Sequence, residues 1–127
     1  MLSPKQLNEK GEPAMAVVKN GRTTGTTFGW LNGLESHVRY YHLNNNSNVP
    51  TLKFKTNETT IVPYAREHGA FSARGDSGSA ILDRNGRVVA LLTGGGGLTD
   101  VTDITFATCW YQLLPLINET LPGAFVL

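Results

Sequence analysis

The segment of this chain most suited to chemistry is a tight turn that carries a serine between two glycines. Residues 71–80 read Phe-Ser-Ala-Arg-Gly-Asp-Ser-Gly-Ser-Ala, which places Ser77 between Asp76 and Gly78. A serine hydroxyl attacks a carbonyl carbon usefully only where preorganised donors hold the oxyanion that forms. Gly75 permits an unusual backbone angle, and Gly78 leaves space beside the hydroxyl. Residues 75–78 alone also fit an ordinary surface turn. With strands on both sides they predict acyl transfer at Ser77, with the backbone N–H groups of Gly75 and Ser77 as oxyanion donors.

Such a serine also needs a general base within hydrogen-bond reach, and the histidines do not offer one. His37 and His42 fall in an expected strand beside Tyr40 and Tyr41, where ordinary surface or half-buried histidines are favoured. His68 lies in an expected loop before Ser77, and a local dyad of the two is disfavoured. Without a base, a serine is a poor nucleophile near neutral pH, so we expect this polypeptide alone to cleave peptides negligibly.

The elements that must position this turn are short strands. The chain of 127 residues suits a single domain, residues 1–127, and its 40% hydrophobic and 17% charged residues predict a folded globule. Apolar or alternating stretches bounded by turn residues predict an antiparallel sandwich or barrel. The expected strands are residues 14–19, 23–31, 37–43, 51–54, 59–63, 79–82, 87–93 and 104–107.

Turn and helix signals complete this prediction. Asn32-Gly33 and Asn85-Gly86 are the strongest hairpin signals, because both residue types tolerate positive φ. Apolar residues at helical spacing after Thr108, a candidate cap, predict a C-terminal helix that packs on the barrel. Pro115 predicts a kink there or two short turns.

In this context the Gly-Asp-Ser-Gly turn resembles that of the trypsin/chymotrypsin-like serine peptidases, and residues 19–27, Lys-Asn-Gly-Arg-Thr-Thr-Gly-Thr-Thr, look most like fungal members. Such enzymes have two six-stranded barrels with the active site between them. The resemblance covers nearly the whole chain and matches only the second barrel. It implies an all-β fold: a single antiparallel six-stranded Greek-key barrel with a short C-terminal helix.

The resemblance also implies roles for residues around Ser77. Asp76 would be a buried carboxylate that braces the turn; in activated family members it pairs with a freed amino terminus, and the sequence identifies no partner here. The strand before Gly94 and Gly95 would bind substrate as an added strand through Thr93 and Gly95. Phe71 would occupy the floor of the specificity pocket, which argues against an Arg or Lys preference. The full set of substrate-binding candidates is Phe71, Ser72, Arg74, Thr93, Gly94 and Gly95.

The chain departs from the family because the base histidine and its orienting aspartate belong to the first barrel, which these residues lack. Two hypotheses follow. The chain is the nucleophile-bearing half of a serine endopeptidase, inactive alone and completed by a first barrel from upstream or in trans; or it is a non-catalytic module that binds peptides or proteins. An isolated half would expose an apolar face and self-associate.

Other functions fit less well. An α/β-hydrolase needs glycine where Ser79 stands, with a helix rather than a strand after it. One cysteine and three scattered histidines give no zinc spacing, and no other cofactor is expected. A net charge of +1 gives no reason to expect nucleic acid or an anionic membrane as partner. Cys109 has no intrachain disulfide partner, and residues 1–10 contain no long apolar run. We therefore expect a soluble chain whose cellular compartment is unknown, with the cytoplasm slightly favoured.

Overall fold

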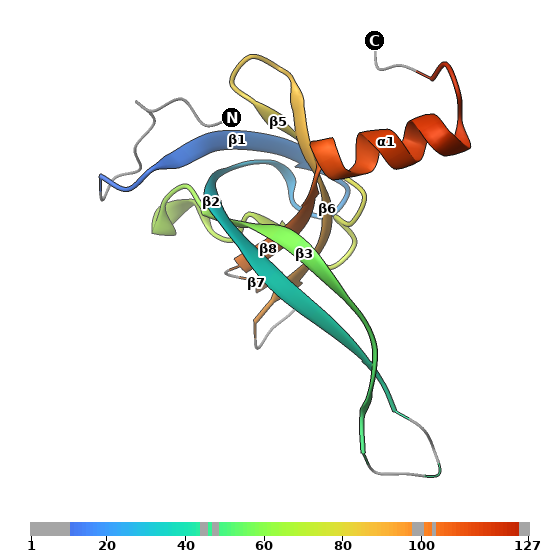
Figure 1. The fold of residues 1–127 in the computed structure, drawn as a ribbon. Helices are drawn as coiled ribbons and strands as arrows, with labels where there is room; N and C mark the ends of the chain where they lie inside the picture. Colours follow the sequence, from blue (N-terminus) through green and yellow to red (C-terminus); the bar gives the residue numbers. More distant parts are fainter. Residues whose placement is uncertain (1–10, 44–45, 47–48, 98–100, 103, 125–127) are drawn as a thin grey trace.

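A closed six-stranded antiparallel barrel forms the body of the molecule (Figure 1). The computed structural model describes residues 11–43, 46, 49–97, 101–102 and 104–124. The order of strands around the barrel is β1-β2-β3-β8-β6-β5, and a second sheet pairs β4 with β7. The strands are β1 (Ala14–Gly21), β2 (Gly25–His42), β3 (Thr51–Pro63), β4 (Ser72–Ala73), β5 (Ala80–Asp83), β6 (Val88–Gly96), β7 (Val101–Thr102) and β8 (Ile104–Cys109). The barrel confirms the predicted fold class.

The core of the barrel comes from alternate residues of its strands. On β1, Val17 is buried on the inward face, and Ile61 of β3 and Ile81 of β5 have no exposed surface. Side chains two residues apart on a strand share a face, so this period of two places one apolar side in the barrel. The remaining core residues are Leu31, Phe71, Ala90, Leu92 and Ala107.

Strand β2 corrects one of the hairpin predictions. Asn32-Gly33 lies within β2, at an irregularity in the pairing of β2 with β3 between Leu31 and Glu35. The Asn32 side chain accepts a hydrogen bond from the Leu34 amide at 3.0 Å, which stabilises this bend. The local turn preference is overridden because β3 pairs with β2 on both sides of the bend. The stretches expected as four strands, residues 23–31, 37–43, 51–54 and 59–63, therefore form two long ones.

Beyond the bend, β2 and β3 leave the barrel as a two-stranded ribbon that projects far from it (Figure 1). The ribbon is exposed along most of its length, and the rings of Tyr40 and Phe54 stack across the strands with centroids 4.5 Å apart. A second irregularity lies between Tyr40 and Tyr41. We use the name ribbon for residues 36–43 and 49–57.

The other hairpin prediction is confirmed. Asn85-Gly86 connects β5 to β6, and Gly86 has a φ of 76°. The buried Asp83 carboxylate accepts hydrogen bonds from the amides of Asn85 and Arg87, at 2.8 and 3.0 Å, and from the Arg87 Nε at 2.8 Å. Burial acts to raise the pKa of Asp83, but these hydrogen bonds and the Arg87 charge lower it.

The C-terminal helix α1 (Trp110–Thr120) packs against β6 and β8, as the sequence predicts. Its N-cap is Cys109 and no side chain caps it, so Thr108 is not the cap; the Thr108 hydroxyl donates instead to Glu58 Oε2 at 2.8 Å. Pro115 lies within one continuous helix rather than between two turns. Pro115 is exposed, so water can reach the position where the proline removes a donor.

Residues 1–10, on which the expectation about a leader segment depends, lie outside the described residues. Within the described part of the chain, α1 is the longest helix, and no helix is long and apolar enough to cross a bilayer.

Candidate functional site

Ser77 is exposed on a turn whose backbone is held by three hydrogen bonds. The Asp76 amide donates to the Ala73 carbonyl at 3.1 Å, the Gly78 amide to the Leu92 carbonyl at 2.7 Å, and the Ser79 amide to the Asp76 carbonyl at 3.1 Å. The second bond ties the turn to β6, where the Leu92 amide in turn donates to the Ser79 carbonyl at 3.0 Å. The turn is therefore an extension of the β5–β6 pairing.

Two glycines give this turn its shape. Gly75 has a φ of 101° and Gly78 a φ of 87°, in the region that L side chains rarely adopt. A Cβ on Gly75 would also lie 2.5 Å from Thr23 Oγ1, whereas one on Gly78 would meet no atom within 4 Å. The open space at Gly78 agrees with the expectation from the sequence that this glycine leaves room beside Ser77.

The amides of Gly75 and Ser77 are available to a ligand. Within the described residues, neither N–H donates to a protein acceptor, although the amides of Asp76, Gly78 and Ser79 all do. Unpaired amides flanking a paired one are the donors that an oxyanion requires. The hydroxyl of Ser77 also makes no hydrogen bond within these residues.

The carboxylate of Asp76 is fully buried and accepts four hydrogen bonds. Its Oδ1 accepts from the amides of Thr23 at 2.7 Å and Thr24 at 3.2 Å. Its Oδ2 accepts from the Thr24 hydroxyl at 2.6 Å and from the Ala73 amide at 3.0 Å. Burial acts to raise the pKa of Asp76, but the Thr24 hydroxyl and the three amides together lower it to about 2. Asp76 is therefore an anion that fastens the turn to residues 23–24.

The charge partner that the sequence left unidentified is Lys19. Its side chain has no exposed surface, and its Nζ lies 3.8 Å from Asp76 Oδ2. The ammonium donates to the Thr24 hydroxyl at 2.5 Å and to the Gly25 carbonyl at 3.0 Å, and it lies 5.4 Å from the centre of the Phe71 ring. Burial lowers the pKa of Lys19, while the charge of Asp76 acts in the opposite direction. A side chain of β1 thus supplies the positive charge beside Asp76.

Gly21 makes room for this buried pair. A Cβ at Gly21 would overlap Asp76 Oδ1, with the Asp76 Cγ only 2.7 Å away. Any side chain there would displace the carboxylate, so the glycine is required by close approach rather than by its φ.

Lys19, Thr23 and Thr24 are the functional residues that sequence reasoning missed. Lys19 carried a signal, because the period of two places it on the inward face of β1 with Val17. A lysine at an inward position of an apolar strand needs a buried anion, and Asp76 was already expected to be buried. The pairing was not predicted because Lys19 and Asp76 are 57 positions apart in the sequence.

The predicted substrate-binding residues near the turn occupy different depths. Phe71 is 1% exposed and its ring belongs to the barrel core. Ser72 is also buried, and its hydroxyl shares a 2.5 Å hydrogen bond with Thr105 Oγ1. Arg74 is exposed beside Gly75. Of these three, only Arg74 offers its side chain to the surface.

The predicted wall of Thr93, Gly94 and Gly95 lies on β6 past the end of β5. There β6 pairs with β8 on one side, through Gly94 with Phe106 and Gly95 with Thr105. On the other side, the last β5 partner is Ala80, opposite Leu91, and no described strand continues the pairing past Leu92. A Cβ on Gly94 would meet nothing within 4 Å. This stretch has the open edge that an added peptide strand needs.

None of the three histidines makes a hydrogen bond to Ser77 within the described residues. His37 Nδ1 shares a hydrogen bond of 2.7 Å with Asn57 Oδ1 on the ribbon. His68 lies in η1 (Arg66–His68) and stacks on Tyr64, with ring centres 5.9 Å apart.

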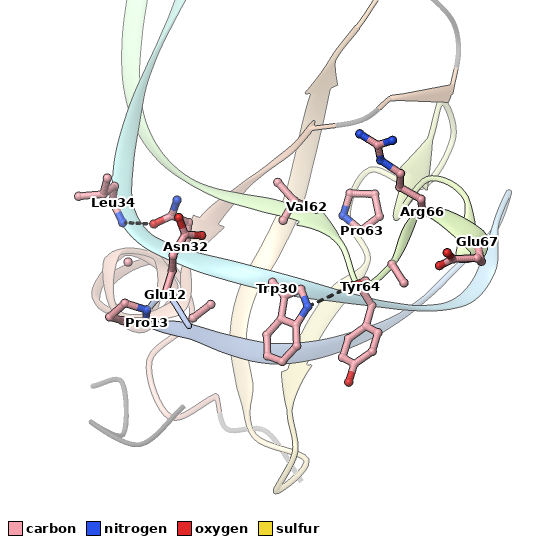
Figure 2. Close-up of a pocket in the computed structure, with 13 residues that line it drawn as sticks. Glu12, Pro13, Trp30, Asn32, Leu34, Val62, Pro63, Tyr64, Arg66 and Glu67 are labelled. Carbon is pink, nitrogen blue, oxygen red and sulfur yellow. Dashed lines mark hydrogen bonds between the residues drawn. The ribbon is translucent and has the colours of Figure 1, made fainter. Parts of the chain in front are cut away.

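A cavity of about 1100 Å³ is lined by residues that do not belong to this turn, and Figure 2 shows them. Its wall includes Trp30 and Tyr64, whose rings stack with centroids 4.9 Å apart, together with Val62 and Pro63. The Trp30 Nε1 donates to the Tyr64 carbonyl at 3.2 Å, and Arg66 lies at the cavity edge with Glu67. No residue of the Ser77 turn lines it.

The comparisons with known proteins agree with the architecture. No known family profile matches the chain, and no curated protein matches it. Among solved structures it is similar to Rv3671c from M. tuberculosis, a serine protease of chymotrypsin-like fold, described in a serine-to-alanine mutant and an inactive form. The similarity has a TM-score of 0.51 and 20% identity over 97% of this chain, and it spans 58% of the length of that protein. The chain therefore has a chymotrypsin-like barrel.

Proposed function

We propose that this chain is the nucleophile-bearing barrel of a serine endopeptidase, with Ser77 as the nucleophile. The observation that carries the proposal is the pair of unpaired amides at Gly75 and Ser77, on a turn fastened by the buried Asp76. Such a turn presents donors without reorganisation when negative charge develops on a substrate oxygen. The exposed Ser77 hydroxyl lies on the same turn.

The reaction assigned to these residues is acyl transfer. The Ser77 hydroxyl adds to the scissile carbonyl as its proton passes to a base, and the oxyanion accepts hydrogen bonds from the Gly75 and Ser77 amides. Collapse expels the amine and leaves an acyl-serine, which water hydrolyses. The open edge of β6 at Thr93, Gly94 and Gly95 supports binding of the peptide as an added strand.

The proton acceptor is assigned to a part of the enzyme other than these residues. The histidines of this chain make no hydrogen bond to Ser77 within the described residues, and the chain matches little more than half of the Rv3671c chain. We expect a first barrel, supplied upstream or in trans, to bring the base histidine and its orienting aspartate. The chain without it has an oxyanion site and a hydroxyl that is a poor nucleophile.

A fluorophosphonate probe tests this proposal. Intact-mass analysis of the 127-residue chain is expected to show negligible labelling, because no base activates Ser77. We call the chain together with its first barrel the completed protein. In the completed protein we expect stoichiometric labelling that Ser77→Ala abolishes. Fast labelling of the chain alone would contradict the missing base, and no labelling in the completed protein would contradict the peptidase.

The second candidate is a non-catalytic module that binds peptides or proteins, and the open edge of β6 favours it equally. The two candidates separate in the completed protein. A binding module retains peptide affinity in the wild type and in Ser77→Ala and never hydrolyses the peptide. An endopeptidase cleaves the bound peptide only while Ser77 is present.

The expected partners are a peptide or protein substrate and either the first barrel or a second copy of the chain. Large apolar side chains are exposed on α1 and at the barrel surface, including Leu116 at 59% and Phe28 at 56%. Apolar surface of this kind favours association. Sedimentation of the chain at increasing concentration tests self-association, and a strictly monomeric chain would leave the first barrel as the partner.

A further inference from the structure

The orientation of one peptide unit decides whether the Gly75 amide is available. In a trans peptide the carbonyl and the N–H of the same unit point in opposite directions. The Arg74 carbonyl accepts a hydrogen bond from the Thr23 hydroxyl at 2.8 Å. The N–H of Gly75 therefore points away from Thr23, and it has no acceptor within the described residues.

Thr23 is itself fixed from a second direction. Its amide donates to Asp76 Oδ1 at 2.7 Å, so its backbone is tied to the residue after Gly75 while its hydroxyl is tied to the residue before. Gly75 also lies against this hydroxyl, because a Cβ there would be 2.5 Å from Thr23 Oγ1. Thr23 thus contacts the turn on both sides of the peptide that carries the Gly75 N–H.

We propose that Thr23 is a positioning residue, whose hydroxyl fixes the Arg74–Gly75 peptide in the orientation that leaves the Gly75 N–H free for an oxyanion. The assignment of that N–H to an oxyanion rests on the proposed function. Rotation of this peptide would exchange donor and acceptor, so that a carbonyl oxygen replaced the N–H and repelled a developing oxyanion. The Asp76 contacts do not prevent that rotation, because none of them involves the Arg74 carbonyl or the Gly75 amide.

The test compares Thr23→Val, which removes the hydroxyl at nearly constant volume, with Thr23→Ser, which keeps it. The readout is the residual dipolar coupling of the Gly75 N–H in the isotopically labelled 127-residue chain. Thr23 is exposed, so both variants are expected to fold. We expect the wild-type coupling in Thr23→Ser and an altered or averaged coupling in Thr23→Val, with the Asp76 amide unchanged in both.

Thr27→Val is the matched control. The Thr27 hydroxyl donates to the Phe71 carbonyl at 2.7 Å, so the variant removes the same kind of hydrogen bond four residues further along the chain, in β2, without touching Arg74. Its Gly75 coupling should equal that of the wild type. An unchanged coupling in Thr23→Val, or an equal change in Thr27→Val, would overturn the proposal. Should Thr23→Val fail to fold, Thr23→Ala provides the same comparison.

A second measurement separates this inference from the proposed function. In the completed protein, Thr23→Val is expected to reduce kcat at least tenfold with little change in KM, because the lost donor acts on the transition state. Thr23→Ser should restore kcat. If the wild type never hydrolyses a peptide, the endopeptidase fails, while the coupling at Gly75 still decides the role of Thr23.

Discussion

The two ends of β2 meet opposite environments. The turn that leads into it, at Thr23 and Thr24, donates to a fully buried carboxylate from its amides and one hydroxyl. The far end lies on the ribbon, where Tyr41 is 54% exposed and where β2 pairs, among the described strands, with β3 alone. Buried polar groups are costly unless all are paired, whereas exposed ribbon contacts compete with water. Stability and site geometry therefore depend on the end of β2 that lies beside Asp76.

The largest effect at the end of β2 beside Asp76 is expected from Lys19→Met. The variant leaves the buried Asp76 carboxylate without its cation, and removal of one partner of a buried pair costs about 3–5 kcal/mol. We expect the free energy of unfolding in urea to fall by that amount. We also expect the hydrogen-bonded amides of this turn, those of Asp76, Gly78 and Ser79, to exchange faster with solvent.

Lys53→Met is the matched control for this prediction, since Lys53 is exposed on the ribbon and lies 5.9 Å from the Phe54 ring centre. Its loss should cost about 1 kcal/mol or less. If both variants destabilise the chain equally, the buried pair does not fasten the turn.

Acid is the second test, because the pKa of Asp76 falls from an ordinary 3.8 to about 2 in the folded chain. A depressed folded pKa stabilises the protein above the unfolded pKa, and the contribution is lost as pH falls toward the folded pKa. The difference corresponds to about 2 kcal/mol. Urea unfolding measured from about pH 6 down to about pH 2 should show this loss, together with one from Asp83, whose pKa is also lowered.

Asp76→Asn isolates this contribution, because Asp83 titrates in both proteins. The variant is expected to be less stable near neutral pH and to change less with pH. A wild-type pH slope in Asp76→Asn would mean that other carboxylates cause the acid sensitivity.

The third test fills the space beside the carboxylate. In Gly21→Ala the new methyl group overlaps Asp76 Oδ1, and overpacking of a buried site costs about 1–3 kcal/mol. The carboxylate must move from Thr24, so thermal unfolding is expected at a lower temperature. Gly94→Ala is the control, because its Cβ meets nothing within 4 Å. An unchanged Tm in Gly21→Ala would show that Asp76 is not held where the structure has it.

Local pattern predicted the antiparallel strands, the terminal helix and the turn at Ser77, and the resemblance to the serine peptidases narrowed the strands to a six-stranded barrel. Alternation along β1 and the Asn85-Gly86 turn need no distant partner to be interpreted. The peptidase assignment itself stays a prediction.

What the sequence did not predict depends on distant partners. Asn32-Gly33 has the local signal of a hairpin, but pairing with β3 keeps it inside a strand. Thr108 has the signal of a helix cap, but its hydroxyl donates a hydrogen bond to the buried Glu58 carboxylate instead. Lys19 and Thr23 act through Asp76 and Arg74, more than 50 positions away. Local sequence propensity does not predict contacts between residues so far apart in the chain.

The smallest effect is expected on the ribbon, from Phe54→Ala. The variant removes the ring that stacks on Tyr40, and a cross-strand aromatic pair contributes about 0.2–1 kcal/mol. Because the ribbon lies outside the barrel, this loss should appear as faster amide exchange along residues 38–41 and 52–56. The free energy of unfolding of the barrel should change by less than about 0.5 kcal/mol.

Phe106→Ala in β8 is the contrasting variant, since the same truncation falls on a half-buried barrel position beside Gly96. It should lower the unfolding free energy of the whole barrel, because a partly desolvated ring is lost from a strand that closes it. If Phe54→Ala destabilises the barrel as much as Phe106→Ala, the ribbon and barrel unfold as one unit. The two ends of β2 would then share one stability, and the distinction between them would fail.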